Sequence, residues 1–197
     1  VIKLFNRWDT SGIVVTDPGL IRYLNLKPVI VPRSEGRNST TKFHKNKSTI
    51  VERLINKLQI PGHKGKKHKI TSGRCPGKTA TATKIVIEAF ETIERVTKEN
   101  PVKIFAKAVE NGAPREEITT IEYGGAKYPQ AVDCAPQRRI DYVLRQMAEG
   151  AYSKAFGSKK TVAQALADEI MAAYKNDSAS AAISKKGEVE RQADSSR

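Results

Sequence analysis

Apolar residues recur every three or four positions from residue 49 onward, which is the period of an amphipathic helix. The first helix is predicted to begin after Thr49, because Thr49 and Glu52 have the spacing of a capping box, and to end before Pro61. Its apolar stripe consists of Ile50, Val51, Leu54, Ile55 and Leu58. Further helices are predicted over about 81–99, 101–111 and 136–157, then from Thr161 and, in a short form, from Ser178. The stripe expected in the second helix consists of Ile85, Ala89, Ile93 and Val96.

The helical period is interrupted between residues 116 and 134. Strand-forming residues run from Ile118 to Tyr123, Gly124-Gly125 provides a turn, and a second strand returns through Tyr128. This order predicts a β-hairpin. Because an isolated two-stranded ribbon is only marginally stable in water, the hairpin is expected to lean on the helical body or on a partner.

The first 47 residues show no sustained period, and Pro18, Pro28, Pro32 and Gly36 interrupt their short apolar pieces. Residues 1–47 are therefore predicted to form an extended basic arm without a core of its own, and residues 48–197 a helical domain. The predicted fold is mainly α: a bundle of about six helices with one protruding β-hairpin and an extended N-terminal arm. Residues 178–197 are expected to form a C-terminal helix and tail.

The positive charge is concentrated at one end of the chain. The first 87 residues carry the whole net charge of +14, because residues 88–197 contain 17 Lys and Arg against 17 Asp and Glu. From Arg53 to Ile87 there are nine basic residues and no acidic one. Solubility alone would not place the charge on one side, whereas a polyanion binds such a stretch by releasing its condensed counterions. The pattern indicates a nucleic-acid partner.

The chain of 197 residues contains two cysteines, Cys75 and Cys134, which suits a reducing compartment. No apolar run approaches the roughly 18 residues that favour a membrane span, and the start lacks the pattern of a secretory leader. We therefore expect a cytoplasmic protein that makes no contact with a membrane.

Three groups of basic residues are candidates for RNA contact. The first lies at the end of the first helix and in the connector after it, where flexible lysines can follow an irregular phosphate path. It comprises Arg53, Lys57, Lys64, Lys66, Lys67 and Lys69. Arg138 and Arg139 begin the fourth helix, where backbone N–H groups also attract phosphate, although an ordinary pair of surface arginines is an equal alternative. Arg115, at the base of the hairpin, offers a planar fork for bidentate phosphate contact.

The predicted tip of the hairpin consists of Tyr123, Gly124, Gly125, Lys127 and Tyr128. A tyrosine in such a position can stack on an RNA base. Tyrosines also cover sheets without any partner, and the sequence leaves both interpretations open.

Seven short segments occur in an order and spacing that make chance agreement improbable. They are Ile50-Val51-Glu52-Arg53-Leu54, Gly65-Lys66-Lys67, Glu99-Asn100-Pro101, Gly112-x-Pro114-Arg115-Glu116, Ala131-Val132-Asp133, Pro136-x-Arg138-Arg139 and Lys185-Lys186-x-Glu188-x-Glu190-Arg191. Together they resemble the universal small-subunit ribosomal protein seven family, whose form in eukaryotic cytosolic ribosomes is called small-subunit protein five. The resemblance covers about residues 48–197, with a weaker match over 2–8. The start and the tail look more like the eukaryotic-type version than the bacterial one.

The resemblance implies a structural protein that binds the 3′ major domain of small-subunit ribosomal RNA in the head of the subunit and supports assembly and translation. It also implies that the hairpin points toward the exit-site tRNA. A neighbouring ribosomal protein would then complete the exit channel of the messenger RNA. In a eukaryote, assembly in the nucleolus would follow.

One segment departs from the family pattern. In the family, the Gly-Lys-Lys turn passes almost directly into the second helix, whereas residues 68–79 form an apparent insertion here. Arg74 and Lys78 in this insertion are candidates for additional RNA contacts. A flexible loop without a partner is the alternative.

Two other functions are alternatives. Residues 72–79 nearly fit the phosphate loop GxxxxGK[ST], but Ser72 replaces the first glycine and a basic segment stands where a buried strand is required, so nucleotide binding is remote. A free nucleic-acid-binding regulator would use a helix-turn-helix, which the long connector between the first two helices disfavours. His63, His68 and Cys75 lack a fourth metal ligand, and no nucleophile–base pair is apparent. Neither a metal, a cofactor nor an enzymatic activity is predicted.

Overall fold

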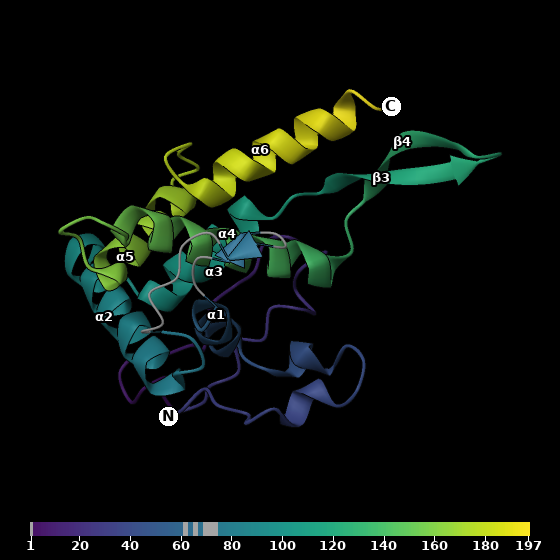
Figure 1. Cartoon of the computed structure of the whole chain (residues 1–197). Coiled ribbons are helices and arrows are strands. Elements are labelled where there is room, and N and C mark those ends of the chain that lie inside the picture. The colour runs from purple at the N-terminus through teal and green to yellow at the C-terminus, as the bar shows by residue number, and fades with distance from the viewer. Residues whose placement is uncertain (1, 61–62, 65–66, 69–74) are drawn as a thin grey trace.

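The computed structural model describes residues 2–60, 63–64, 67–68 and 75–197, which form six α-helices and two antiparallel pairs of strands (Figure 1). The helices are α1 (Ile50–Leu58), α2 (Thr79–Thr97), α3 (Pro101–Gly112), α4 (Pro136–Ala155), α5 (Val162–Tyr174) and α6 (Ala181–Asp194). The strands are β1 (His63–Lys64), β2 (Lys67–His68), β3 (Glu116–Tyr123) and β4 (Ala126–Asp133), and two 3-10 turns lie at Arg37–Ser39 and His44–Lys47. The prediction of a mainly helical fold with one protruding hairpin is confirmed.

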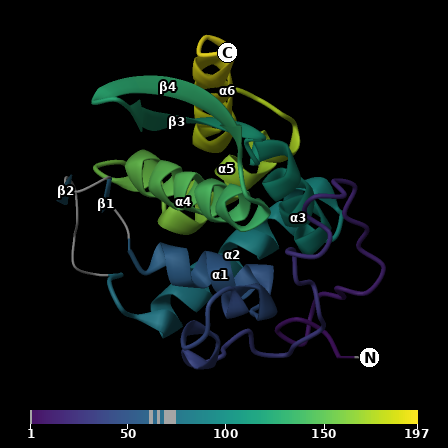
Figure 2. The ribbon, with the colours of Figure 1, turned by 90° about the vertical axis from the view of Figure 1, so that its right-hand side faces the viewer.

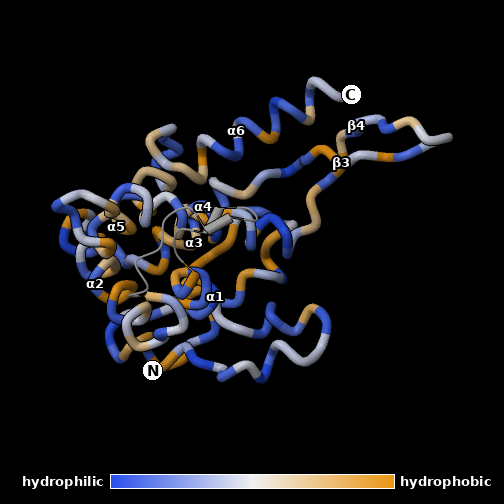
Figure 3. Tube along the Cα trace, viewed as in Figure 1, coloured by the Kyte–Doolittle hydropathy of each residue, from blue (hydrophilic) through white to orange (hydrophobic). Residues whose placement is uncertain are grey.

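Helix α5 lies at the centre of the helical body, because it packs against α2, α3 and α4 at once (Figure 2). Leu166 and Ile170 of α5 are fully buried, together with Phe90 of α2, Phe105 of α3 and Leu144 of α4. Figure 3 shows the apolar segments gathered where these helices meet. Burial of this shared apolar surface is the main stabilising contribution to the fold.

Side-chain caps set the starts of α3 and α5 as predicted. The side-chain oxygen of Asn100 accepts a hydrogen bond from the Val102 N–H at 3.0 Å, directly before α3. Thr161 and Gln164 form a complete capping box at the start of α5. These caps satisfy backbone donors that have no partner within the first helical turn.

The capping box predicted at α1 is only half formed. Thr49 Oγ1 accepts from the Glu52 N–H at 3.3 Å, but the Glu52 carboxylate does not return to Thr49. It accepts instead from the Ser34 N–H of the arm at 2.9 Å. A tertiary contact has therefore replaced the local one, and α1 is fastened to the arm.

The stripe predicted for α2 was wrong at its end. Val96 lies in the last turn and is 63% exposed. The residues of α2 that are buried are Ala82, Val86, Ala89, Phe90 and Ile93. Two adjacent stripes of this helix are apolar enough to face a core, and the position of α5 decides which of them is covered.

Helix α6 differs from its prediction in both start and length. It begins at Ala181 with Ser180 as the capping residue, rather than at Ser178, and its 14 residues do not make it short. Ser180 is buried, and its hydroxyl donates to Glu169 Oε1 at 2.7 Å. Glu169 is fully buried and also accepts from Lys154 Nζ at 2.6 Å, so this carboxylate ties α4, α5 and α6 together.

The arm contributes to the core of the helical body. Leu4, Trp8, Leu20 and Leu24 are all buried in it. The indole of Trp8 packs edge-on against Phe90 with ring centroids 5.6 Å apart, and its Nε1–H donates to Glu94 Oε2 at 3.0 Å. Sequence periodicity did not reveal these contacts, because the four residues are separated by turns rather than by a helical repeat.

A buried carboxylate on α3 holds the next part of the arm. Glu110 accepts hydrogen bonds from the Thr16 N–H at 2.5 Å, from Thr16 Oγ1 at 2.8 Å and from Lys107 Nζ at 2.9 Å. Burial alone would raise the pKa of Glu110, but these bonds outweigh it and lower the pKa below its usual value. Across the described residues, no helix combines the length and apolar character that crossing a membrane requires.

Candidate nucleic-acid interface

A basic cluster forms where α1, α4 and the arm meet, with four cationic side chains around one carboxylate. The carboxylate is that of Asp141 on α4, which pairs with Arg53 of α1 at 3.0 Å and with Lys45 of the arm. Lys57 on α1 and Arg145 on α4 lie close enough to act electrostatically on the same charges. Four cations against one anion leave a net positive charge, which suits a phosphate backbone.

Burial and the neighbouring charges shift the pKa values of Lys57 and Asp141 in the basic cluster. Partial burial lowers the pKa of Lys57; Asp141 opposes this effect, and the nearby cations Arg145, Lys45 and Arg53 reinforce it. Burial alone would raise the pKa of Asp141, but the hydrogen bond from Lys45 and the charge and hydrogen bond of Arg53 outweigh it and lower that pKa. A phosphate next to Lys57 would stabilise its charged form.

Arg53 does not have the exposure expected of a residue that contacts RNA directly. Its side chain is 6% exposed and donates from Nη2 to Asp141, while Nη1 is buried without a hydrogen-bond partner among the described residues. The apolar stripe of α1 that was predicted from sequence is buried, and Arg53 is buried with it. In the structure Arg53 makes an internal ion pair with Asp141.

Arg139 is likewise an internal connection. Its Nε–H donates to the Pro114 carbonyl at 3.0 Å and its Nη2 pairs with Asp17 at 2.7 Å, and the side chain is buried. It joins the start of α4 to the segment before β3 and to the arm. The two arginines that the sequence offered together as candidates for phosphate contact are therefore split, since the neighbouring Arg138 is exposed.

A groove of about 390 Å³ opens beside the basic cluster, between the arm and the first turns of α4. Phe43 lies on the arm side and is 74% exposed, while Tyr142 and Arg145 lie on the α4 side. An exposed aromatic ring next to cationic groups is the chemistry that stacks on a base and neutralises the adjacent phosphate. We refer to this feature as the α4 groove.

Arg138 lines the α4 groove and Arg115 lies near the base of the hairpin. The Arg138 Nε–H donates to the Glu117 carboxylate at 2.8 Å, which fixes the guanidinium while leaving most of it in solvent. Arg115 is exposed, and its backbone N–H donates to Glu190 of α6 at 3.0 Å. Both side chains are accessible to a phosphate, in contrast to Arg139.

The hairpin projects away from the helical body (Figure 1). Its register pairs Glu122 with Lys127 and Tyr123 with Ala126, and Gly124 and Gly125 make the turn with positive φ of 58° and 81°. Such a turn favours glycine. Tyr123 is 82% exposed, and Lys127 and Tyr128 are also exposed. Helix α6 lies along the hairpin base, where Arg197 pairs with Glu116, so the hairpin leans on the body there.

The connector between α1 and α2 is described only in part. Lys64 and Lys67 are paired in the register of β1 with β2. Lys78 is exposed at the start of α2. The predictions for Lys66, Lys69 and Arg74 fall outside the described residues, as do residues 69–74 of the proposed insertion at 68–79.

The structure does not favour either alternative function, nucleotide binding by a phosphate loop or a free nucleic-acid-binding regulator. Residues 72–74 of the phosphate-loop segment lie outside the described residues, and α1 and α2 are separated by residues 59–78, far more than a helix-turn-helix uses. The part of the chain that is described holds no group of three or more His, Cys, Asp or Glu that could bind a metal. Burial and the nearby Glu117 raise the pKa of the Cys134 thiol to about 11.

Comparison with known proteins identifies the family. The model of the family described as ribosomal protein S7p/S5e matches residues 22–197. The chain belongs to this family. A relative named small ribosomal subunit protein uS7 from Nanoarchaeum equitans is 53% identical over the whole chain and 99% of its own length. Proteins of the same name from Methanococcus aeolicus and Archaeoglobus fulgidus are 49% and 46% identical over the whole chain, covering 99% and 95% of their lengths.

The family match spans every element of the candidate interface from the arm to α6. Four residues of that interface were missed from the sequence: Phe43, Lys45, Tyr142 and Arg145. Arg145 could have been found, because it follows Arg138 by seven residues on the same face of a helix. Phe43 and Lys45 carried no such signal, since only the fold of the arm brings them to α4.

Proposed function

We propose that the chain is a structural constituent of the small ribosomal subunit, without a catalytic role. Its membership of the ribosomal protein S7p/S5e family is the observation that carries this proposal. The names of its archaeal relatives, all small ribosomal subunit protein uS7, support it. The expected location is the ribosome in the cytoplasm, and assembly in a nucleolus would apply only to a eukaryotic host.

The protein binds ribosomal RNA through the basic cluster and the α4 groove. Lys45, Lys57, Arg138 and Arg145 neutralise phosphates there, and Phe43 offers an exposed ring for stacking on a base. Arg53 and Arg139 act indirectly, because their buried guanidinium groups hold Asp141 and the arm in place. The proposal extends to Arg115 at the hairpin base and, on the charge of the sequence alone, to the basic residues of the connector, which are Lys64, Lys66, Lys67, Lys69, Arg74 and Lys78.

The RNA is the 3′ major domain of the small-subunit ribosomal RNA, in the head of the subunit. The resemblance noted from sequence supports this location, near the exit-tRNA site and the exit channel of the messenger RNA. The exposed hairpin tip, with Tyr123 and Lys127, suits a contact with exit-site tRNA. Binding there would support subunit assembly and translation, together with neighbouring ribosomal proteins.

Sedimentation of native lysate through a sucrose gradient tests the ribosomal role. The chain should co-migrate with small subunits and translating ribosomes in high salt, and ribonuclease should shift it to light fractions. Residence in light fractions that ribonuclease does not change would contradict the proposal. It would favour instead a free nucleic-acid-binding regulator or a nucleotide-binding protein.

The RNA surface is tested by binding to a transcript of the 3′ major domain, with a 5′-domain transcript as the RNA control. The double variant Lys57→Ala/Arg145→Ala should weaken binding and reduce the dependence of log K on log salt by about one for each phosphate that is no longer neutralised. Lys159→Ala removes the same kind of charge from an exposed loop distant from the basic cluster in sequence, and should change neither. Equal effects of the double variant and this control would contradict the proposed surface.

A further inference from the structure

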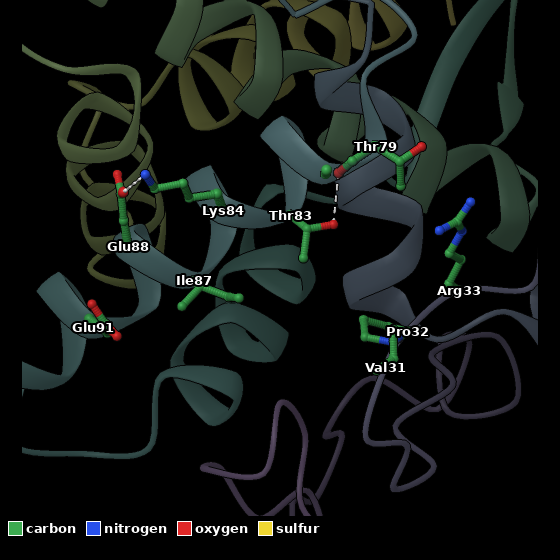
Figure 4. A pocket seen from close by; sticks show the side chains of 10 residues that line it. Val31, Pro32, Arg33, Thr79, Thr83, Lys84, Ile87, Glu88 and Glu91 are labelled. Atoms are coloured by element: carbon green, nitrogen blue, oxygen red, sulfur yellow. Dashed lines mark hydrogen bonds and ion pairs between the residues drawn. The ribbon is translucent and has the colours of Figure 1, made fainter.

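A second groove lies between the arm and the first half of α2. It has a volume of about 540 Å³, and Val31 and Pro32 of the arm face Thr83 and Ile87 of α2 across it (Figure 4). A further hollow of about 400 Å³ adjoins it, and the two share Pro32, Arg33 and Thr79. Together they form an elongated depression along the arm, which we call the α2 groove. Its length suits an extended chain better than a compact small molecule.

The α2 groove exposes apolar surface. Val31 is 60% exposed and the preceding Ile30 is also exposed, whereas Ile87 packs partly against the core and forms the floor. Large aliphatic side chains in solvent beside a concave surface are typical of an interaction site. Removing them from water would supply a favourable contribution to binding that requires no RNA.

The charges at the rim argue against RNA and for a basic partner. Glu88 and Glu91 line the larger hollow and Glu35 and Glu52 line the adjoining one, against the two cations Arg33 and Lys84. These carboxylates would repel a phosphate backbone, although the chain as a whole carries +14. Glu88 is only loosely paired, with Lys84 Nζ at 3.9 Å, so its carboxylate can take a cationic partner. Arg33 is already paired with Glu35 at 3.3 Å, and Glu91 is paired with Arg7.

We propose that the α2 groove binds an extended segment of another protein, in which apolar side chains cover Val31 and Ile87 and a lysine or arginine reaches Glu88. Charge complementarity selects this occupant: the same rim disfavours nucleic acid and favours a basic polypeptide. The site is separate from the basic cluster. This inference rests on the proposed function in one respect, which is that the partner is expected to be a protein of the small ribosomal subunit.

A photo-crosslinking side chain at position 84 tests the inference in living cells before lysis, with the same group at position 103 on α3 as the control. Lys84 lines the groove, and Lys103 is an exposed lysine on another helix. We expect one protein to be crosslinked from position 84 alone, through a segment that combines apolar residues with a lysine or arginine. Val31→Asp and Glu88→Lys should each reduce this crosslink about tenfold, as removal of a central interface side chain does.

Several outcomes would overturn the inference: a crosslink to ribosomal RNA, to a second copy of the chain, to the chain itself, or to no molecule. Val31→Asp changes an exposed side chain, so its fold is checked by circular dichroism and is expected to be unaffected. Because crosslinking precedes lysis, its result does not depend on sedimentation. A chain that co-sediments with small subunits yet gives no protein crosslink refutes only the α2 groove, whereas a chain absent from small subunits refutes the proposed function.

Discussion

Replacing Asp141 with asparagine is expected to act on the stability of the fold and on the affinity for RNA in opposite directions. Asp141→Asn keeps the size of the side chain but removes the one negative charge of the basic cluster. Arg53, 6% exposed, then loses an ionised partner at 3.0 Å, and Lys45 of the arm loses the same partner. The perturbation therefore tests whether this carboxylate holds the arm, α1 and α4 together.

The geometry sets the size of the expected effect. A hydrogen bond to a charged group contributes about 1.5–3 kcal/mol, and breaking a buried ion pair costs about 3–5 kcal/mol. Because the Asp141 side chain is partly exposed, water can solvate Arg53 in the variant. We therefore expect the free energy of unfolding to fall by about 2–3 kcal/mol, or the melting temperature by about 4–12 °C for a chain of this size.

The affinity for RNA should change in the other direction. Asp141→Asn adds one unit of positive charge to the surface next to the α4 groove, so the folded variant should bind the 3′ major domain transcript at least as tightly as the parent chain. Its salt dependence should also be steeper. A residue important only for stability would not produce this increase.

Urea unfolding followed by circular dichroism measures the loss of stability, and filter binding through a salt series measures the affinity. Asp168→Asn is the matched control, because Asp168 pairs with the exposed Lys160 and such a surface pair contributes little. If Asp141→Asn and Asp168→Asn shift the unfolding midpoint equally, Asp141 does not anchor Arg53 and the argument fails.

Acid provides a second check on the same residue. The pKa of Asp141 is depressed below its ordinary value of 3.8, because hydrogen bonds and charge from Lys45 and Arg53 outweigh the effect of burial. A carboxyl group with a depressed folded-state pKa stabilises the fold above its unfolded pKa and loses that contribution as the pH falls through the folded value. The difference in stability between parent and Asp141→Asn should therefore shrink below about pH 4. A constant difference down to pH 2 would contradict this assignment.

Three further changes have defined outcomes. Trp8→Ala should lower the free energy of unfolding by about 3–5 kcal/mol and Trp8→Phe by about 1 kcal/mol, because only Trp8→Ala removes the ring that packs against Phe90. In the parent chain, the fluorescence of Trp8 and the circular dichroism of the helices should report the same unfolding transition if the arm and the body share one core. Glu169→Gln should cost about 1–3 kcal/mol and increase proteolytic cleavage at the start of α6, where Ser180 loses its charged acceptor; unchanged cleavage would refute the role of Glu169. Since burial and Glu117 raise the pKa of Cys134 to about 11, its alkylation by iodoacetamide should be slow at pH 8 and accelerate only in strong alkali; rapid reaction at pH 8 in the folded chain would contradict its burial.

Local rules were sufficient for most helix and strand assignments. Asn100 before Pro101 and Thr161 before Val162 mark helix starts by backbone capping, which depends only on neighbouring residues. The Gly124-Gly125 turn is local in the same way, because its positive φ angles favour residues without a Cβ. The concentration of charge in the first 87 residues also indicated a polyanionic partner without any knowledge of the fold.

Tertiary packing decided which basic residues remain accessible. Arg138 and Arg139 cannot be distinguished from the sequence alone. Successive helical residues are rotated by about 100°, so Arg138 remains in solvent while Arg139 points to Asp17 and Pro114. Arg53 is buried because it lies on the face of α1 that α4 covers. Phe43 and Lys45 reach α4 only through the fold of the arm.

The sequence by itself therefore determined the six helices, the β3–β4 hairpin and their order, and it indicated a polyanionic partner, since each of these depends on local periodicity, capping and composition. The tertiary structure alone decided which apolar stripe of α2 is buried, where α6 begins, and which cations face solvent. These features depend on contacts between different elements, such as Glu169 with Ser180 and Trp8 with Phe90. The pattern of residues along the chain does not show such contacts.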